Sequence, residues 1–289
     1  MFNTENIFIN YCKEKDMRFH EVIFELEQKE FGENAESFLN YLQCILDTMK
    51  ASATKSQKET LTTRFKMIDG FSNKMFEYSK KSPIVGEDLA RAMSYAFSTS
   101  EVNASMGKIV AAPTAGASGI IPAVLLFAKE KYNFSDEVLI QGLLASIGVG
   151  KFIGKYGNFS GAQGGCQAET GSGAAMAAGA MVEMMGGTPS EVFTAASIAL
   201  INVMGLVCDP IAGLVEYPCT FRNASGMMNA LISSDMALAG VHSVVPFEEV
   251  VQAMNEVGNL MDEDLRETGI GGLAGTKTGI KIRKEFLGE

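Results

Sequence analysis

The sequence predicts an all-α fold, with an α/β arrangement as the second fold class, on three observations. Apolar residues recur at helical spacing near the N-terminus, as at Phe19, Val22, Ile23 and Leu26. A strong helix-start signature, Thr188–Glu191, occurs further along, where a proline follows a capping threonine and its missing N–H costs nothing. Strand signals are scarce, because no stretch alternates cleanly between apolar and polar residues.

Amphipathic helices are predicted over the first fifty residues, where a second run repeats the helical spacing. This run comprises Phe38, Leu39, Leu42, Ile45, Leu46 and Met49. A polar segment, Lys50–Thr60, follows it and is interpreted as a hinge, a loop or a helix start. We therefore expect a single domain, 1–289, with N-terminal helices at 1–60 and a helical core with the functional site at 61–289.

The core is predicted to contain a helix that begins near Gly86 or Glu87 and ends before Gly107. Residues 107–114 are a candidate short strand, which Pro113 argues against. Later helices are predicted to begin at residues that favour a first turn, namely Ile120, Ser135, Pro189 and Pro246.

The composition is typical of a soluble protein, and its net negative charge disfavours binding to polyanions. The 289 residues carry a formal net charge of −10, which argues against a nucleic-acid or anionic-membrane partner. Two long uncharged stretches, Ile109–Ala128 and Val192–Cys208, are interpreted as buried helices because they contain prolines, glycines or polar residues. No secretion signal is apparent at the N-terminus, and the five cysteines suggest a reducing cytoplasm rather than a disulfide framework.

Three of the cysteines lie beside glycines and prolines: Cys166, Cys208 and Cys219. Their spacing does not match a zinc ribbon, and three buried apolar side chains are one interpretation. The other is a [4Fe–4S] cluster on three thiolates, which leaves one iron open as a Lewis acid. Cys44 falls on an apolar helix face and is interpreted as a core residue, whereas the sequence does not decide whether Cys12 is a core residue or a fourth ligand.

The stretch Ser160–Met181 is unusually rich in glycine and alanine around Cys166. We interpret these small residues as room for the backbone to approach a bulky group that the sulfur holds. A second glycine-rich turn, Thr114–Gly119, leads into the predicted helix at Ile120. Its free N–H groups suit a carboxylate, although a plain tight turn explains the same residues.

Four segments together resemble the α subunit of the bacterial iron–sulfur-dependent L-serine dehydratases. They are APTAGASGIIPAVL, GCQAETGSGAAMAA, GLVCDPIAGLVEYPCTFRNA and LRETGIGGLA. The resemblance implies an all-helical catalytic domain of the serine dehydratase alpha-chain type, with Cys166, Cys208 and Cys219 as cluster ligands and no pyridoxal phosphate. It also implies L-serine as substrate and a separate β subunit with an ACT-like regulatory module, in an αβ hetero-oligomer.

The expected reaction is α,β-elimination of water from L-serine, which gives pyruvate and ammonium. The substrate carboxylate is expected on the N–H groups of the turn at Thr114, Ala115, Gly116, Ala117, Ser118 and Gly119. Lys155 and Ser118 are the candidate catalytic residues, with Lys155 as the general base. The rivals for the base are His242 and a residue of the β subunit, whereas His20 is expected on the surface.

Further polar contacts to the substrate are expected from Ser160, Arg222 and Asn223, unless Arg222 instead braces the loop that carries Cys219. The glycine-rich segment Asp264–Gly279 is either a cover over the site or a flexible tail. Two other functions remain open on the sequence. One is an L-cysteine desulfidase on the same frame, and the other is a non-catalytic structural metal protein.

Overall fold

The computed structural model describes residues 2–31 and 34–288, and the regular structure of this part of the chain is helical. The N-terminal helices are α1 (Glu5–Lys15), α2 (Phe19–Phe31), α3 (Ala35–Lys58) and α4 (Phe71–Ser79). The core helices are α5 (Glu87–Ala104), α6 (Ile120–Tyr132), α7 (Asp136–Tyr156), α8 (Gly161–Gly164), α9 (Ser172–Met184), α10 (Pro189–Ile201), α11 (Cys219–Leu238) and α12 (Phe247–Leu260), and α13 (Lys277–Leu287) ends the chain. Three short turns complete the set, a π-helical turn η1 (Gln167–Gly171) and two 3₁₀ turns, η2 (Ile211–Gly213) and η3 (Glu263–Leu265). The predicted all-α fold is confirmed, since the candidate strand at 107–114 is irregular and the described residues form no strand.

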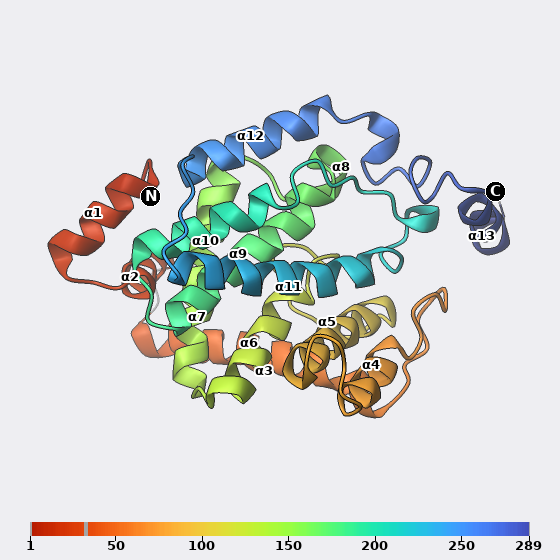
Figure 1. Ribbon diagram of the computed structural model, residues 1–289, viewed down its shortest axis with the longest axis horizontal. Helices are drawn as coiled ribbons and strands as arrows, with labels where there is room; N and C mark the ends of the chain where they lie inside the picture. The colour runs from red at the N-terminus through yellow and green to blue at the C-terminus, as the bar shows by residue number, and fades with distance from the viewer. Residues whose placement is uncertain (1, 32–33, 289) are drawn as a thin grey trace.

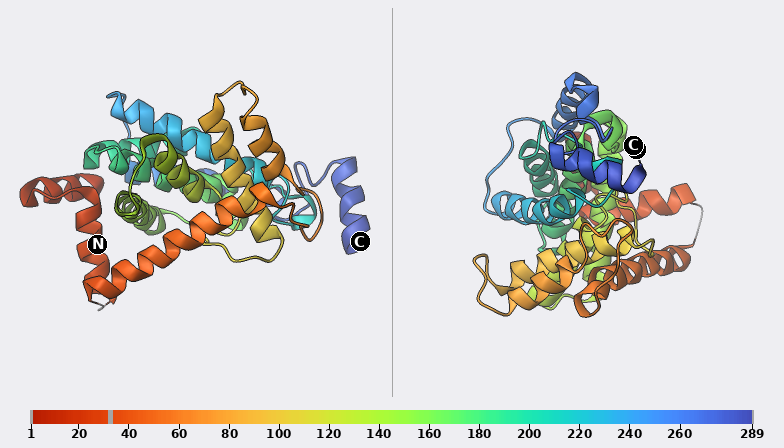
Figure 2. Two further views of the ribbon diagram at one scale, coloured as in Figure 1. Left: turned by 90° about the horizontal axis from the view of Figure 1, so that it is seen from below. Right: turned by 90° about the vertical axis from the view of Figure 1, so that its right-hand side faces the viewer.

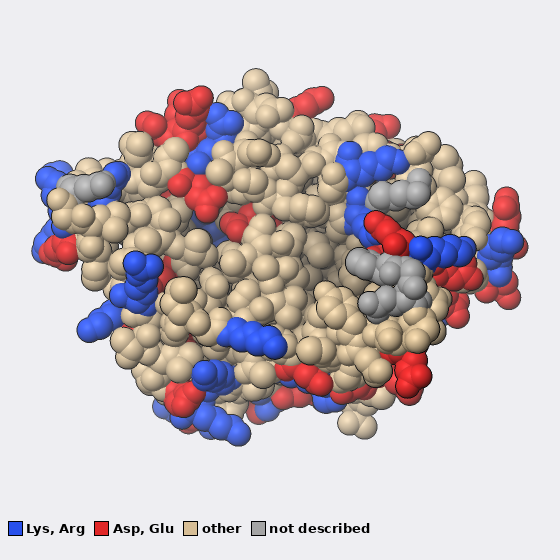
Figure 3. All heavy atoms as spheres, turned by 180° about the vertical axis from the view of Figure 1, so that it is seen from behind, with Lys and Arg blue, Asp and Glu red and all other residues tan. Residues whose placement is uncertain are grey.

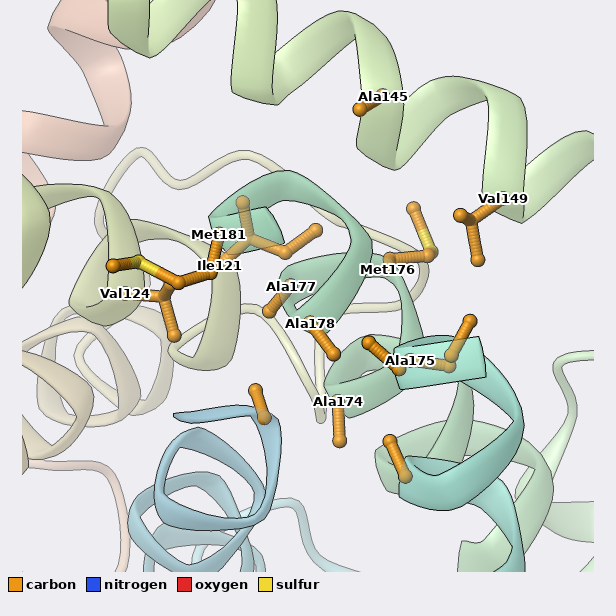
Figure 4. Close-up of a cluster of buried hydrophobic side chains, with 14 of the residues drawn as sticks. Ile121, Val124, Ala145, Val149, Ala174, Ala175, Met176, Ala177, Ala178 and Met181 are labelled. Atoms are coloured by element: carbon orange, nitrogen blue, oxygen red, sulfur yellow. The ribbon is translucent and has the colours of Figure 1, made fainter. Parts of the chain in front are cut away.

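Helix α9 is the centre of the molecule and is enclosed by α6, α7, α10 and α11 (Figure 1). Each of its residues is buried, and its alanines and methionines pack against neighbours such as Val149 of α7 and Ile121 of α6 (Figure 4). A helix that is apolar on all sides is typical of the core of a bundle.

The small residues of α9 serve helix packing, which corrects the interpretation of the stretch after Cys166. A Cβ on Gly179 would lie 2.8 Å from Cγ2 of Val149, and one on Gly173 would lie 3.0 Å from Cδ1 of Ile120. Glycine therefore lets the neighbouring helices approach closely. Gly161, before Cys166, does fit the original interpretation, because a Cβ there would lie 2.9 Å from the sulfur of Cys208.

The predicted helix starts are confirmed in the core, where capping residues supply the hydrogen bonds that the first turn lacks. Thr188 caps α10 through a capping box with Glu191, and Ser135 caps α7 by accepting from the N–H of Val138. Helix α5 begins at Glu87 as predicted, and α12 begins directly after Pro246. Local sequence signals thus determine where most core helices begin.

Helix α7 is long and apolar enough to cross a membrane by length and composition alone. Within the protein, however, 56% of its most apolar window is buried, and it packs against α2 and α9. These properties are typical of a central helix of a bundle.

The polar segment Lys50–Thr60 does not separate two parts of the chain, because α3 continues through it to Lys58. Its buried face carries Ser52, Ser56 and Gln57, which lie against α5. The N–H of Ser56 donates to Ser98, and the amide of Gln57 donates to Ser94. Hydrogen bonds here replace the apolar contacts by which the sequence pattern would have revealed a helix.

The chain after α12 follows a separate course, and α13 projects from one end of the bundle (Figures 1 and 2). Phe286 of α13 packs edge-to-face on Phe65 at 5.4 Å between ring centroids.

On the face shown in Figure 3, Lys and Arg side chains lie in small groups interspersed with Asp and Glu.

Candidate active site

A pocket of about 560 Å³ opens where the glycine-rich turn before α6 meets the end of α7 and the residues before Cys166. It is lined by Thr114, Ala115, Gly116, Gly154, Gly157, Asn158, Phe159, Ser160, Gly161, Gln163, Glu169, Val215 and Glu267. Segments that are far apart in the sequence therefore meet at one concave surface.

Glu169 is the buried acid of this pocket, and the sequence prediction missed it. The residue is 8% exposed and lies on η1, the π-helical turn that begins directly after Cys166. Burial, followed by the negative charges of Cys166 and Glu267, raises the pKa of its carboxyl to about 7 against a hydrogen bond from Thr114 that lowers it. A carboxyl group with these properties can exchange a proton near neutral pH.

Thr114 orients this carboxyl group. Its hydroxyl donates to Oε1 of Glu169 and accepts in turn from the N–H of Ala117 at 3.3 Å. Gly116 lies directly against the carboxyl group, since a Cβ there would be 2.5 Å from Oε1 of Glu169. The side chain of Thr114 is therefore engaged with Glu169, whereas the predicted substrate contact concerned its backbone N–H.

The glycine-rich turn offers fewer free N–H groups than the sequence predicted. The N–H of Ser118 donates to the carbonyl of Ala115 at 3.3 Å, and that of Gly119 donates to Oδ1 of Asn223 at 2.8 Å. With Ala117 bonded to Thr114, the N–H groups of Thr114, Ala115 and Gly116 are those left without a partner among the described hydrogen bonds of the turn. All three residues line the pocket, so the candidate donors to a substrate carboxylate are reduced from six N–H groups to these three.

Asn223 links this turn to the cysteine helix α11. Its amide group donates to the carbonyl oxygens of Gly116 at 2.6 Å and Cys219 at 2.9 Å, while its oxygen accepts from Gly119. The side chain is fully engaged and 1% exposed, so it holds the turn rather than reaching into the pocket. Ser118 is equally internal, because its hydroxyl donates to the carbonyl of Ala115 at 2.7 Å.

The three predicted cysteines are buried and free; Cys166 and Cys208 are hydrogen-bonded to each other, and Cys219 is close enough to be affected by the charge of Cys166. A hydrogen bond from Cys208 lowers the pKa of the Cys166 thiol to about 6, with further support from Arg222 and from Thr170 at 2.9 Å. The same interaction raises the pKa of Cys208, and burial raises that of Cys219. Of the three sulfurs, Cys166 is therefore the one whose thiolate form its surroundings stabilise.

Arg222 braces the cysteine loop, which is the alternative role that the sequence suggested for it. Its guanidinium donates to the carbonyl of Val207 at 2.6 Å, to Asp209 and to the sulfur of Cys166. Another buried carboxylate, Glu216, fixes the same loop by accepting from the N–H groups of Phe65 at 2.9 Å and Met67 at 3.1 Å. The loop between Cys208 and Cys219 is therefore held from both sides.

These residues fit an iron–sulfur cluster by the chemistry of their side chains. Within residues 2–31 and 34–288, no three His, Cys, Asp or Glu side chains converge on one point as a single metal ion requires. In a cluster, each thiolate instead binds a different iron. Three neighbouring buried thiols with the cationic Arg222 beside them match that requirement, since the guanidinium offsets the negative charge of the thiolates.

The predicted base Lys155 does not reach the pocket. Gly154 and Gly157 share the helix face that lines it, whereas Lys155 projects from another face and donates to the carbonyl of Phe2 at 3.0 Å and to Asn3 at 2.7 Å. Its rival His242 is exposed on the segment before α12 and does not line the pocket. Ser160 does line it, as predicted for a polar contact.

His20 was expected on the surface, but it is partly buried. Its Nδ1 lies 2.5 Å from Oε1 of Glu183, which also pairs with Arg18 at 3.0 Å. This cluster joins α2 to the far end of α9 and lies outside the pocket.

The segment after α12 is attached to the cysteine loop. Cys208 donates its N–H to the carbonyl of Leu265 at 2.8 Å, and Glu267 donates its N–H to the carbonyl of Cys208 at 2.6 Å. Leu273 donates to Oδ2 of Asp209 at 2.7 Å. The first part of the predicted cover therefore belongs to the wall of the site rather than to a free tail.

Comparison with known proteins identifies the family. The serine dehydratase alpha chain family matches residues 14–274. The L-serine dehydratase alpha chain of Peptoniphilus asaccharolyticus is 59% identical over 290 residues, which cover 100% of this chain and 99% of that protein. The probable L-serine dehydratase alpha chain of Bacillus subtilis is 42% identical over 289 residues, covering 100% and 96%. The L-serine dehydratase of Helicobacter pylori is 39% identical over 204 residues, which are 68% of this chain and 45% of that one. The resemblance seen in the sequence is confirmed, and the chain belongs to the serine dehydratase alpha chain family.

Proposed function

We propose that this chain is the catalytic alpha chain of an iron–sulfur-dependent L-serine dehydratase, a lyase that converts L-serine to pyruvate and ammonium. The names of its full-length relatives support the activity. The observation that carries the proposal is the buried carboxyl of Glu169, which faces the same pocket as the unpaired N–H groups of the glycine-rich turn and lies near the three buried cysteines.

Cys166, Cys208 and Cys219 would hold a [4Fe–4S] cluster. When bound, a cluster on three thiolates supplies a Lewis acid that favours departure of the substrate's hydroxyl group. Pyridoxal phosphate is not part of the proposal, because the residues that line the pocket include no lysine to carry it.

The protein's own residues would bind the substrate and move its proton. The N–H groups of Thr114, Ala115 and Gly116 bind the carboxylate of L-serine and lower the cost of negative charge at the adjacent Cα. The carboxylate of Glu169, held by Thr114 and in contact with Gly116, removes the Cα proton. Loss of this proton and of the β-hydroxyl group gives aminoacrylate, which tautomerises to an imine that water hydrolyses to pyruvate and ammonium.

A regulatory β chain with an ACT-like module is proposed as the partner, in an αβ hetero-oligomer. The relatives that match over their whole length are named alpha chains, and the Helicobacter pylori protein has more than half of its length outside the matched region. A cytoplasmic location is proposed from the five free thiols, which persist in a reducing compartment.

The proposal is tested by anaerobic purification of the chain with its partner, followed by iron determination and a pyruvate assay. A brown protein with about four irons that forms pyruvate from L-serine is expected. A colourless protein with about one metal ion and no turnover would instead indicate a structural metal site. Sulfide release from L-cysteine faster than pyruvate formation from L-serine would indicate a desulfidase.

The pH dependence of turnover should follow Glu169. The base works as a carboxylate, and its pKa is raised to about 7, so kcat/KM for L-serine should rise as the pH increases through about 7. The profile is measured anaerobically at fixed cluster content from pH 5 to 9. A rate that stays constant between pH 5 and 7 would contradict this role.

Gly116→Ala should impair turnover without removing the cluster. The added methyl group would meet all three terminal atoms of the Glu169 carboxyl group within 3.0 Å and displace it. Misplacement of a catalytic group by about 1 Å costs on the order of 100-fold, and we expect a loss of kcat of that size. Gly86→Ala is a control for added volume, since nothing lies within 4 Å of a Cβ there, although its φ of 84° disfavours alanine.

A further inference from the structure

Glu267 is a second carboxylate in the pocket of the proposed active site. It comes from the segment after α12, which is far from Glu169 in the sequence, and its Oε2 lies 3.0 Å from the position of a Cβ on Gly161. Its negative charge is close enough to contribute to the raised pKa of Glu169. Two acidic side chains thus face one cavity.

The position of Glu267 is fixed by its backbone. Its N–H donates to the carbonyl of Cys208 at 2.6 Å, and its φ of 62° lies in the left-handed region that side chains with a Cβ disfavour. A strained backbone conformation of this kind persists only where the surrounding structure enforces it, and such conformations are common at functional sites.

In the described part of the chain, neither carboxylate forms an ion pair, although the charge of Arg222 is close enough to Glu169 to lower its pKa. Among residues 2–31 and 34–288, no Lys, Arg or His side chain forms an ion pair with Glu169 or Glu267, and no hydrogen bond is described for the carboxylate of Glu267. Nearby Arg222 is engaged by Asp209 and Cys166. The pocket therefore combines two acidic side chains with the N–H groups of Thr114, Ala115 and Gly116, which suit an anion.

An α-amino acid in its zwitterionic form matches both parts of this pocket. Its carboxylate suits the N–H groups, and its ammonium group suits an unpaired carboxylate. Because Glu169 is in contact with the turn that would hold the substrate carboxylate, it is placed for the Cα proton. Glu267 is the remaining acid and lies on the side of Gly161 and Cys208.

We propose that Glu267 binds the α-ammonium group of the substrate and so selects amino acids over carboxylic acids that lack this group. The proposal rests on the proposed function, since it assigns a substrate contact within the same pocket. Glu267 is a binding residue in this role, and the elimination itself remains with Glu169.

The test compares L-alanine with propionate, which differ by the ammonium group and both lack a hydroxyl group to eliminate. Binding of each to the anaerobically purified, iron-loaded protein is measured by calorimetry for the wild type, Glu267→Gln and Glu267→Asp. Glu263→Gln is the matched control, because Glu263 lies on the same segment and its side chain is 91% exposed.

Glu267→Gln should weaken L-alanine binding by about 10- to 100-fold, the usual effect of losing a charged hydrogen-bond partner, and leave propionate binding unchanged. Glu267→Asp should restore part of the preference, and Glu263→Gln should change neither ligand. The KM for L-serine should rise with a smaller change in kcat.

Equal weakening of both ligands by Glu267→Gln, or a wild type that binds propionate as tightly as L-alanine, would overturn the proposal. These binding measurements need no turnover. A wild type that prefers L-alanine through Glu267 but forms no pyruvate would refute the proposed dehydratase function alone, whereas pyruvate formation with an unchanged ligand preference would refute the ammonium contact alone.

Discussion

Glu169→Gln is expected to lower kcat for L-serine by about 10²- to 10⁴-fold, the range for loss of a general base. Glutamine keeps the shape of the side chain and can still accept from Thr114, but it cannot take a proton. The measurement is pyruvate formation at saturating L-serine, with each preparation adjusted to the same iron content.

Two further variants test whether the loss of activity is specific to the carboxylate of Glu169. Glu169→Asp keeps the base but withdraws it from Gly116, so an intermediate rate is expected. Glu256→Gln removes an exposed carboxylate from α12 and should leave the rate unchanged. A wild-type kcat for Glu169→Gln would place the base elsewhere, such as on the partner chain.

Replacement of Cys166, Cys208 or Cys219 by serine is the second change with a large expected effect. Loss of residues that only support metal ligands costs about 10- to 100-fold, so loss of a ligand itself should lower pyruvate formation by more than about 100-fold. Iron content and the brown colour should fall with it. Cys44→Ser is the control, because Cys44 is exposed and distant from the other three in sequence.

Each single-cysteine variant also distinguishes loss of the cluster from loss of the folded structure. Circular dichroism should show unchanged helix content, since the thiols lie in loops or at the start of a helix and the core around α9 does not depend on them. A variant that keeps its iron and its rate would remove that cysteine from the ligand set.

The fold was largely predictable because its signals are local. Residues that favour a helix start act within one turn, as Ser135 does for α7 and Thr188 with Pro189 for α10, and α5 and α12 also begin where the sequence predicted. The polar half of α3 escaped prediction because its buried face bonds through Ser52, Ser56 and Gln57. A search for apolar residues at helical spacing does not detect a buried face that is polar.

The candidate site was predictable only in part because its geometry is tertiary. Lys155 is close to the pocket in sequence, but helix rotation directs it elsewhere. Glu169 was hidden in a stretch noted for glycine and alanine, although a lone acid in a buried, small-residue segment was itself a signal. Asn223 shows the same limit, since its hydrogen bonds to Gly116 and Gly119 span more than a hundred residues.

The most direct test of the central claim is the rate of pyruvate formation as a function of iron content in the unaltered protein. Anaerobic samples loaded to different degrees are assayed for iron, sulfide and pyruvate in parallel. If three thiols hold a cluster that takes part in the elimination, the rate should rise in proportion to iron, up to about four atoms per chain. Full pyruvate formation by iron-free protein would contradict the account.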